Sequence, residues 1–398
     1  MITALTTLTD LTSSPPQTNK HMKDLFNRRK FIKNTGAAAT GMALLSSLPK
    51  KSIAGFKAEP KIRFSVIGIN HGHINGMIGA ITRGGGQLVS VYAKEPDLLA
   101  NFSRQFPQAK VAKSEQEILE DNSIQLIMSS GIPEDRAPLG IRVMQHGKDY
   151  LVDKPGIITL DQLTQVRKVQ KETKRIYSIM YSERFENKAT VKAGELARSG
   201  AIGTVLQTVI LAPHRISPKT RPDWFWDKKR YGGIICDIGS HQFDQFLYFT
   251  NSTKADIVAA QIGNLHNQQY PKFEDFGDIM LRGNNGSGYI RVDWFTPDGL
   301  NTWGDGRLTV LGSDGFIEVR KNTDIASDHK GGNHLYMVTQ KETKYIDCNQ
   351  EPLPFGGLFV DDILSRTETA MPQEHCFLAT ELALKAQKNA QWITNIPK

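Results

Sequence analysis

Residues 61–81 read KIRFSVIGINHGHINGMIGAI, and this stretch decides the fold. Its first part, from Lys61 to Gly68, is a short apolar run that ends in glycine, which is typical of a buried strand before a tight turn. From Ile74 onward, apolar residues recur at helical spacing. A strand, a glycine turn and a helix in this order open a dinucleotide-binding unit, so we expect a Rossmann-type parallel sheet in the N-terminal domain.

The turn after this strand differs from the usual G-x-G-x-x-G pattern. Gly68 is in register with the first glycine, whereas Asn70 stands in place of the second and His73 in place of the third. Asparagine tolerates left-handed backbone conformations better than most residues, and Gly72 supplies further freedom. We expect Gly68, Asn70, His71, Gly72 and His73 to contact a cofactor. Because no third ligand is near the two histidines in the sequence, we predict no metal site.

The end of the second expected strand, residues 87–92, bears on the type of cofactor. An acidic residue usually stands at this strand end and binds the adenosine ribose hydroxyls. Here the position is Ala93, and Lys94 follows it. A lysine beside a missing carboxylate suits the 2′-phosphate of NADP better than it suits NAD, although Glu95 is an alternative ribose ligand. We therefore expect NAD or NADP, with a lean toward NADP and with Lys94 in contact with it.

A lysine also stands at the end of a later strand of the same sheet. Residues 124–128 form a buried strand that leads into Ser130, and the strand 150–153 is followed directly by Lys154 and Pro155. Ligands of open α/β sheets bind outside the carboxyl ends of the strands, which is where Lys154 lies. We expect Ser130, Lys154 and Pro155 to contact the cofactor. The alternative for Lys154 is a solvated lysine of a surface loop.

The stretch 232–249 places Asp237, His241, Asp244 and Tyr248 at helical spacing, within a narrow arc of one helix face. It contains no Lys, Arg or Glu, the long charged residues that normally cover a solvated face. A carboxylate and an imidazole in such a helix indicate a polar face that lines a cleft. The alternative is a core helix with a hydrogen-bonded histidine and two solvent-facing aspartates.

Taken in order, these motifs resemble the Gfo/Idh/MocA family of sugar and cyclitol oxidoreductases. The resemblance covers residues 61–392. It rests on the glycine turn, on Asp153-Lys154-Pro155 as a variant of the family's Glu-Lys-Pro, and on the pattern Gly-Gly…Asp-x-Gly-x-x-x-x-Asp within 232–244. It implies an NAD(P)-dependent dehydrogenase that transfers hydride from a secondary hydroxyl of a sugar, cyclitol or sugar derivative.

The resemblance implies roles for three residues. His241 is expected to take the hydroxyl proton, and an imidazole titrates near working pH. Asp237, one turn earlier, is expected to orient that imidazole or to bind the neighbouring hydroxyl. Lys154 is expected to hold the reacting oxygen and to favour its developing negative charge. The resemblance also implies a homodimer or a homotetramer.

The second half of the chain predicts a different architecture. From residue 202 onward, short apolar segments alternate with Gly, Asn and Asp turns, which is typical of an antiparallel sheet. We therefore expect an α+β C-terminal domain with a large, mostly antiparallel open sheet. The expected divisions are a leader at 1–54, a dinucleotide-binding domain at 55–175, a substrate and oligomerisation domain at 176–372, and a C-terminal helix within 373–398 that packs back on the first domain.

Aromatic and basic residues gather in the loop 213–227, next to the candidate catalytic helix. Aromatic rings stack on sugar faces, and positive charges bind hydroxyls or a carboxylate. We expect the small-molecule carbohydrate substrate to contact residues of this loop and of the segment after residue 180. The expected contacts are Tyr181, Arg184, His214, Arg215 and Trp224. The alternative is a packed loop whose tryptophans fill a domain interface.

Residues 1–54 have the features of an export signal. Arg28 and Arg29 precede an uncharged run at 35–48 and a small-residue cleavage site at 52–54, a pattern that resembles a twin-arginine signal. The run is too short to span a bilayer comfortably, so we expect no stable membrane span. We expect the twin-arginine machinery to export the folded protein to the periplasm with its cofactor tightly bound.

The formal net charge of +8 is concentrated in this leader. Residues 1–54 hold eight basic and two acidic side chains, which leaves +2 for the rest of the 398 residues. A basic surface for nucleic acid is therefore missing from the expected domains, and we predict no nucleic-acid partner. The three cysteines, Cys236, Cys348 and Cys376, are scattered and match neither a disulfide framework nor a metal motif.

Two other functions remain open at this point. Some exported relatives resemble glycoside hydrolases or lyases that oxidise a sugar transiently and then recover the cofactor, and such a reaction would use the same three residues. An exported enzyme has no obvious supply of fresh nicotinamide, which favours a retained cofactor. The departures from the family pattern at Asn70, His73 and Ala93 leave a non-enzymatic sugar-binding protein as the other alternative.

Overall fold

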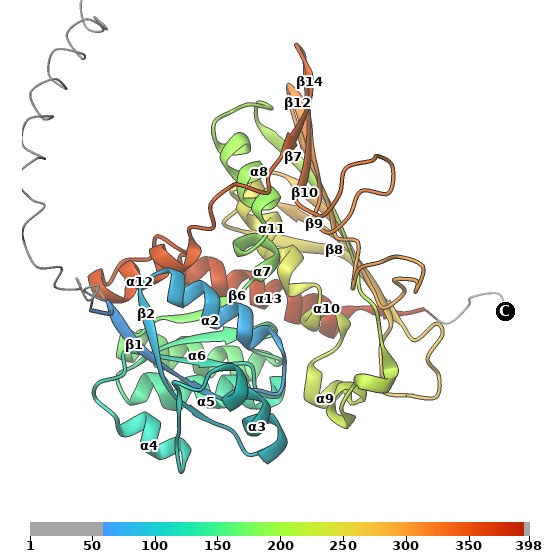
Figure 1. Cartoon of the computed structure of the whole chain (residues 1–398). Coiled ribbons are helices and arrows are strands. Elements are labelled where there is room, and N and C mark those ends of the chain that lie inside the picture. The colour runs from blue at the N-terminus through green and yellow to red at the C-terminus, as the bar shows by residue number, and fades with distance from the viewer. Residues whose placement is uncertain (1–58, 394–398) are drawn as a thin grey trace, which may run out of the picture. The chain divides into compact units, whose positions relative to one another are not determined.

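Six parallel strands form the first sheet of the computed structural model, which describes residues 59–393 (Figure 1). Their order is β3-β2-β1-β4-β5-β6, and every pairing is parallel. The strands are β1 (Ile62–Ile67), β2 (Gly86–Tyr92), β3 (Lys110–Val111), β4 (Leu126–Ser129), β5 (Asp149–Asp153) and β6 (Tyr177–Met180). The prediction of a Rossmann-type parallel sheet is confirmed.

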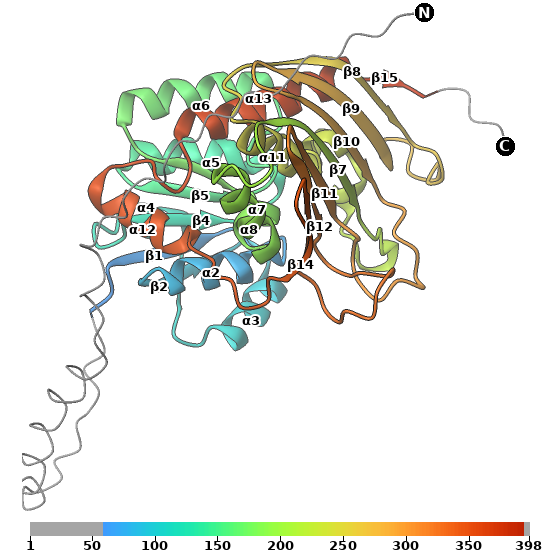
Figure 2. The ribbon, with the colours of Figure 1, turned by 90° about the horizontal axis from the view of Figure 1, so that it is seen from above.

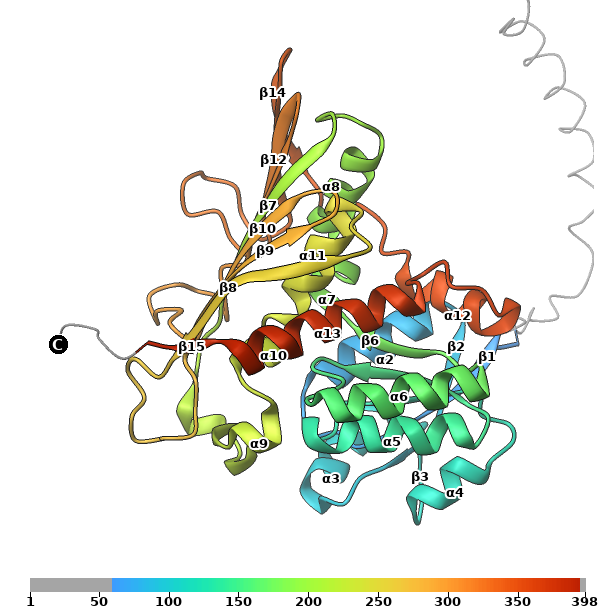
Figure 3. The same ribbon diagram turned by 180° about the vertical axis from the view of Figure 1, so that it is seen from behind.

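Helices cover both faces of this sheet, which buries β4, β5 and β6 along their whole lengths. Right-handed crossovers place α2 (His73–Arg83) on one face, and α5 (Pro133–Gln145) and α6 (Leu160–Thr173) on the other, as Figures 1 and 3 show from opposite sides. The shorter helices α3 (Pro96–Gln105) and α4 (Glu115–Glu120) lie on either side of β3 in the sequence. Burial on both faces explains why these strands are continuous apolar runs.

The second sheet has nine strands in the order β14-β13-β12-β11-β7-β10-β9-β8-β15. Its pairings are antiparallel except β7 with β10 and β8 with β15, so the predicted large, mostly antiparallel open sheet is confirmed. The strands are β7 (Val205–Pro213), β8 (Ala255–Gly263), β9 (Phe276–Gly283), β10 (Ser287–Asp293), β11 (Arg307–Gly312), β12 (Gly315–Arg320), β13 (His334–Thr339), β14 (Thr343–Asp347) and β15 (Gln391–Trp392).

Helices α8 (Lys188–Arg198) and α11 (Ser240–Thr250) cover one face of the nine-stranded sheet (Figure 2). Alternate residues of the strands face these helices and are buried, as the pattern of β7 and β9 shows. The short helices α7 (Ser182–Phe185) and α9 (Lys228–Tyr231) lie in the connections before α8 and before α10 (Ile234–Asp237).

The expected single helix at 232–249 is two helices, α10 (Ile234–Asp237) and α11. Gly233 precedes α10 with a φ of 93°, and Gly239 lies between the helices. A Cβ atom on Gly239 would lie only 2.4 Å from the carbonyl oxygen of Ile235, so the chain turns here with a close backbone approach that only glycine allows. Asp237 and His241 therefore belong to separate helices, which corrects the prediction of one continuous face.

The last helices of the chain return to the first sheet. α12 (Phe355–Ser365) packs on α2, and α13 (Gln373–Asn389) contacts α6, β6, α10 and α11 (Figure 3). α13 ends at Asn389, and the chain after it is extended and forms β15 beside β8. The first sheet extends past the expected division at residue 175, since β6 is its edge strand.

The predicted export signal at residues 1–54 lies outside the described residues. Between residues 59 and 393, no helix combines the length and the apolar character that a membrane crossing requires.

Candidate active site

Lys154 and Asp237 form an ion pair at the carboxyl end of β5. Lys154 Nζ lies 3.1 Å from Asp237 Oδ1, and the two side chains are only 6% and 14% exposed. β5 positions the lysine, and the last residue of α10 supplies the carboxylate. Each charge offsets part of the cost of burying the other, so the lysine and the carboxylate stay together as a paired polar group.

This ion pair lines a cavity of about 330 Å³, a size that suits a small ligand. One side of the cavity comes from the first βα turn and the strand ends of the parallel sheet, and the other side from the loop after β7 and the end of β10. The lining residues are His71, His73, Pro133, Arg136, Asp153, Lys154, His214, Arg215, Arg221, Trp224, Phe225, Asp237, Trp294 and Trp303.

Asp153 is the centre of a cluster with the two histidines of the turn. His73 Nδ1 lies 2.9 Å from Asp153 Oδ1, and His71 Nδ1 lies 3.5 Å from Oδ2. Burial would raise the pKa of Asp153, but the positive charges of His73 and Arg136 outweigh this effect and hold that pKa well below its usual range. The fold thus supplies a carboxylate 80 residues from His73 in the sequence, which we had not expected near the histidines.

The same three side chains could in principle hold a metal ion, because their ligand atoms lie within 4.8 Å of one another. The charges around them argue against it. The Arg136 guanidinium, 1% exposed, lies 3.2 Å from Asp153 Oδ2, and its Nε donates a hydrogen bond to the carbonyl of Gly131. A divalent cation would meet this fixed positive charge beside its single carboxylate ligand. The absence of a metal site stays a prediction.

A second crevice of about 320 Å³ lies at the carboxyl ends of β1, β2 and β4, between strands whose connections leave in opposite directions. Dinucleotides bind at such a switch point in open α/β sheets. Gly68 has a φ of 80°, and a Cβ atom there would lie 3.0 Å from Gly131 Cα, so two chain segments pass closely only because both residues are glycine. Asn70 and Lys94 line the crevice with them. These features fit the adenosine half of a nicotinamide cofactor.

Some of the other predicted cofactor residues line the cavity of the Lys154–Asp237 pair, and the rest are buried or lie at the beginning of α2. His71, His73 and Lys154 line the neighbouring cavity. Ser130 is fully buried, and its hydroxyl donates a 2.8 Å hydrogen bond to the carbonyl of His71, so it holds the turn in place. Pro155 is buried as well, and its carbonyl accepts from Arg136. Open space surrounds the Cα of Gly72 at the beginning of α2, where backbone N–H groups favour an anion.

His241 lies on α11, 2% exposed, and is absent from the side chains that line the cavity. Burial lowers the pKa of His241 to about 3, so its imidazole is neutral at ordinary pH. Its Nδ1 is buried without a hydrogen-bond partner among the described residues. Its carbonyl accepts from Gln245, whose side-chain oxygen accepts from Lys321, so polar contacts to the residue after β12 fix this part of α11.

Two residues that we expected at the substrate lie in the protein interior instead. Arg184 forms two hydrogen bonds to Asp244, at 2.6 and 2.7 Å, and Asp244 also lies 2.8 Å from His375 Nε2. Tyr181 is fully buried with its hydroxyl 3.2 Å from the Thr380 hydroxyl. Neither Arg184 nor Tyr181 lines the cavity. The physical reason is that the charge of Arg184 is matched by Asp244, one turn beyond His241, where the helix faces α13.

The three residues expected from the 213–227 loop do line the cavity. The ring of His214 packs between Trp294 and Trp303, with ring centroids 5.4 and 4.6 Å apart. Burial lowers the pKa of His214 to about 4, so this imidazole is also neutral at ordinary pH. Neither tryptophan was predicted, because they come from the end of β10 and the loop after it, far from any motif in the sequence.

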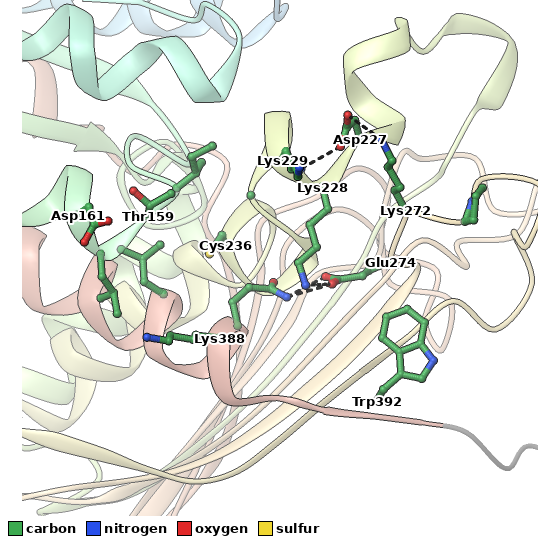
Figure 4. A pocket seen from close by; sticks show the side chains of 16 residues that line it. Thr159, Asp161, Asp227, Lys228, Lys229, Cys236, Lys272, Glu274, Lys388 and Trp392 are labelled. Atoms are coloured by element: carbon green, nitrogen blue, oxygen red, sulfur yellow. Dashed lines mark hydrogen bonds and ion pairs between the residues drawn. The ribbon is translucent and has the colours of Figure 1, made fainter.

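A larger cavity of about 680 Å³ lies elsewhere, beside α9, α10 and the end of α13 (Figure 4). Its buried carboxylate, Glu274, accepts hydrogen bonds from Gln387 and the backbone of Ile234 and lies 2.5 Å from Lys228 Nζ. These polar groups satisfy one another, and Cys236 is the one thiol on the wall. No member of the Lys154–Asp237 pair reaches this cavity, so the candidate active site is the smaller one.

The fold defines a two-domain protein whose first sheet is of the dinucleotide-binding type. Residues 190–318 match the GFO/IDH/MocA C-terminal domain. A solved protein from Erwinia carotovora atroseptica SCRI1043, provisionally described as an oxidoreductase, is 44% identical, with a TM-score of 0.81 and coverage of 84% of this chain and 100% of that one. The chain therefore belongs to the Gfo/Idh/MocA family of oxidoreductases, and the predicted family membership is confirmed.

Two curated relatives are more distant. The chain is 24% identical over 268 residues to a glycosyl hydrolase family 109 protein of Shewanella pealeana, which is 59% of this chain and 58% of that protein. It is 26% identical over 173 residues to scyllo-inositol 2-dehydrogenase (NADP(+)) of Bacillus subtilis, which is 42% of this chain and 47% of that protein. The chain thus spans about half the length of these relatives.

Proposed function

We propose that the protein is an NAD(P)-dependent oxidoreductase that acts on a secondary hydroxyl of a sugar, cyclitol or sugar derivative. The observation that carries this proposal is the Lys154–Asp237 pair, which lines one cavity together with the histidines of the cofactor turn. A ligand in this cavity is therefore next to both a cation and the nucleotide-binding strand ends. The similarity to scyllo-inositol 2-dehydrogenase agrees with a cyclic polyol as substrate.

The chemistry divides between the chain and the cofactor. Gly68, Asn70, His71, His73 and Lys94 are the residues that would hold a nicotinamide cofactor, which would supply the hydride acceptor. Lys154 donates a hydrogen bond to the reacting oxygen and stabilises the negative charge that develops there. Asp237 keeps the ammonium group of Lys154 in one position through their 3.1 Å contact.

The proton of the hydroxyl requires a base, and we assign this role to His241. The family resemblance supports this assignment. The lowered pKa of His241 keeps its imidazole unprotonated, and the same shift makes it a weaker base than an exposed histidine. His214 is the alternative, because it lines the cavity and is neutral for the same reason. Replacing the base by glutamine lowers turnover by about 10²-fold or more while the cofactor remains bound. Comparison of His241→Gln with His214→Gln decides between them, and unchanged rates in both would contradict the mechanism.

We further propose that NADP is the preferred cofactor. Lys94 lines the adenosine crevice, and no carboxylate stands at Ala93. Glu95 was the alternative ligand for the ribose hydroxyls. Its carboxylate instead accepts a 2.8 Å hydrogen bond from Asn70. Titration of the purified protein with NADP and with NAD measures the preference, and tighter binding of NAD would contradict it.

A second candidate function is hydrolysis or elimination of a glycoside through transient oxidation with a retained cofactor. The similarity to a glycosyl hydrolase family 109 protein favours it, and the same residues would act. Aryl glycosides incubated with the purified protein, without added cofactor, distinguish the two reactions. Release of the aryl group without net NAD(P)H supports hydrolysis or elimination. Stoichiometric NAD(P)H from a free polyol supports the dehydrogenase.

We also propose that the protein is exported by the twin-arginine machinery and assembles as a homodimer or homotetramer. The sequence pattern at Arg28 and Arg29 supports export, and fractionation of cells with an Arg28→Lys/Arg29→Lys double variant as control tests it. Exposed apolar side chains on strands of the nine-stranded sheet, among them Leu206, Val258 and Met280, support association through that sheet. Native mass measurement reports the assembly and any retained cofactor together.

A further inference from the structure

The cavity contains one cation whose charge has no carboxylate partner within residues 59–393. Four basic side chains line it, and three of them are paired. Arg136 pairs with Asp153, and Lys154 with Asp237. The third, Arg215, lies 3.7 Å from the exposed carboxylate of Asp298. The fourth is Arg221.

Arg221 is half-buried, and its contacts hold its guanidinium in one place without neutralising it. Its Nε and Nη2 donate hydrogen bonds to the backbone carbonyls of Ile216 and Arg215, at 2.8 and 3.2 Å. Its guanidinium lies over the rings of Phe225 and Trp294, 4.4 and 4.9 Å from their centroids. A guanidinium remains charged in proteins, so this positive charge persists at the cavity wall.

A fixed, partly desolvated positive charge is costly unless an anion approaches it. Burial lowers the pKa of Arg221 from its usual value and outweighs the opposing influence of the Asp237 carboxylate, which is already paired with Lys154. Around it the wall is aromatic, with Trp224, Trp294 and Trp303, and aromatic faces stack on sugar rings. The indole nitrogen of Trp294 is also buried without a hydrogen-bond partner in the described part of the chain. The wall therefore offers a ring-stacking surface next to an unmatched cation.

We propose that the substrate is an acidic sugar, and that the guanidinium of Arg221 binds its carboxylate. A planar guanidinium matches a carboxylate in shape and charge, and such pairs are among the strongest hydrogen-bonded contacts in proteins. The inference rests on the proposed function for the reaction itself and adds the class of substrate. A uronate therefore enters this cavity in preference to a neutral sugar of the same ring size.

Pairs of probes that differ in one carboxylate charge test whether the cavity recognises that charge. D-glucuronate and D-glucuronamide differ by one charge at the same position, and D-galacturonate and D-galactose form a second pair. Their binding to the purified protein with its cofactor is measured by calorimetry, so the readout does not depend on turnover. We expect each acid to bind at least about tenfold more tightly than its uncharged partner, with an affinity that falls as salt is added.

Variants of Arg221 assign that preference to one side chain. Arg221→Gln lowers the affinity for D-glucuronate by about tenfold or more and changes that for D-glucuronamide by about twofold or less. Arg221→Lys retains the charge and part of the preference, and its thermal unfolding shows whether the fold survives. The matched control is Arg167→Gln, because Arg167 pairs with Glu374 and Glu381 on α13, outside the cavity, and leaves both affinities unchanged.

Three results overturn the inference. The first is a wild-type protein that binds neither acid or binds acid and uncharged probes equally. The second is an Arg221→Gln protein that loses both kinds of probe to the same extent. The third is an Arg221→Gln protein that loses NADP binding and keeps acid binding. Arg221 would then bind a phosphate of the cofactor and not the substrate. If Arg221 recognises the acids but no nicotinamide is reduced, the inference stands and the proposed function fails. If only neutral sugars are oxidised, the proposed function stands and the inference about an acidic substrate fails.

Discussion

The neutral, buried imidazole of His241 is expected to make the free energy of unfolding depend on pH in the acid range. In the folded protein, burial lowers its pKa from 6.5 to about 3. Between these values the unfolded chain binds a proton that the folded chain does not, so the free energy of unfolding falls as pH falls. From about pH 7 to about pH 5, this one imidazole removes about 2 kcal/mol. The contribution is complete above pH 6.5 and declines until the folded protein itself takes the proton, near pH 3.

Substitution by glutamine removes this titration, so His241→Gln is expected to lose about 2 kcal/mol less than the wild type over that pH interval. Urea denaturation at several pH values, followed by tryptophan fluorescence, gives the free energies. His146→Gln is the matched control, because His146 is exposed and solvent reaches its ring in both states. The same pH slope in the wild type and in His241→Gln would refute the reasoning, since it would mean that the folded protein protonates His241 as easily as the unfolded chain does.

Three further predictions follow from the site. Lys154→Met lowers turnover by about 10²- to 10³-fold with the cofactor still bound, because the developing negative charge loses its cation; initial rates and a cofactor titration check both parts. Asp244→Asn leaves the buried guanidinium of Arg184 unpaired and lowers the free energy of unfolding by about 3–5 kcal/mol, measured by urea denaturation, and an unchanged value would count against a structural role. Lys94→Ala weakens NADP binding by about fivefold and NAD binding little, in a paired titration, because only NADP carries the 2′-phosphate.

The parallel sheet was predictable because its signals are local. A glycine-ended strand, a helical period and a lysine after a later strand are each visible within about twenty residues, and the topology of open sheets then brings the strand ends together. The nine-stranded sheet was predictable in type from its short alternating segments. β14 and β15 have no such signal, because their largely exposed residues carry no clear apolar alternation.

The site was harder to predict, because its composition depends on contacts between distant segments. Lys154 and Asp237 were identified from motifs, but the pairing of Asp153 with His73, and the place of Trp294 opposite His214, have no local signal. Arg184 is an example. An arginine has the residue type that a sugar site uses, yet Arg184 is already bound by the buried Asp244, which lies one helical turn after His241 on α11.

The break at Gly239 also constrains how this protein can change. Ile234 N and Ile235 N donate to Glu274 and Gln387, so α10 is tied to the second sheet and to α13, whereas α11 has its own contacts. Any side chain at position 239 would push against the carbonyl of Ile235 and shift these two anchored segments apart. Position 239 therefore has to remain glycine if Asp237 and His241 are to keep their spacing. Substitutions that change the substrate preference are expected in the loops that surround the cavity instead.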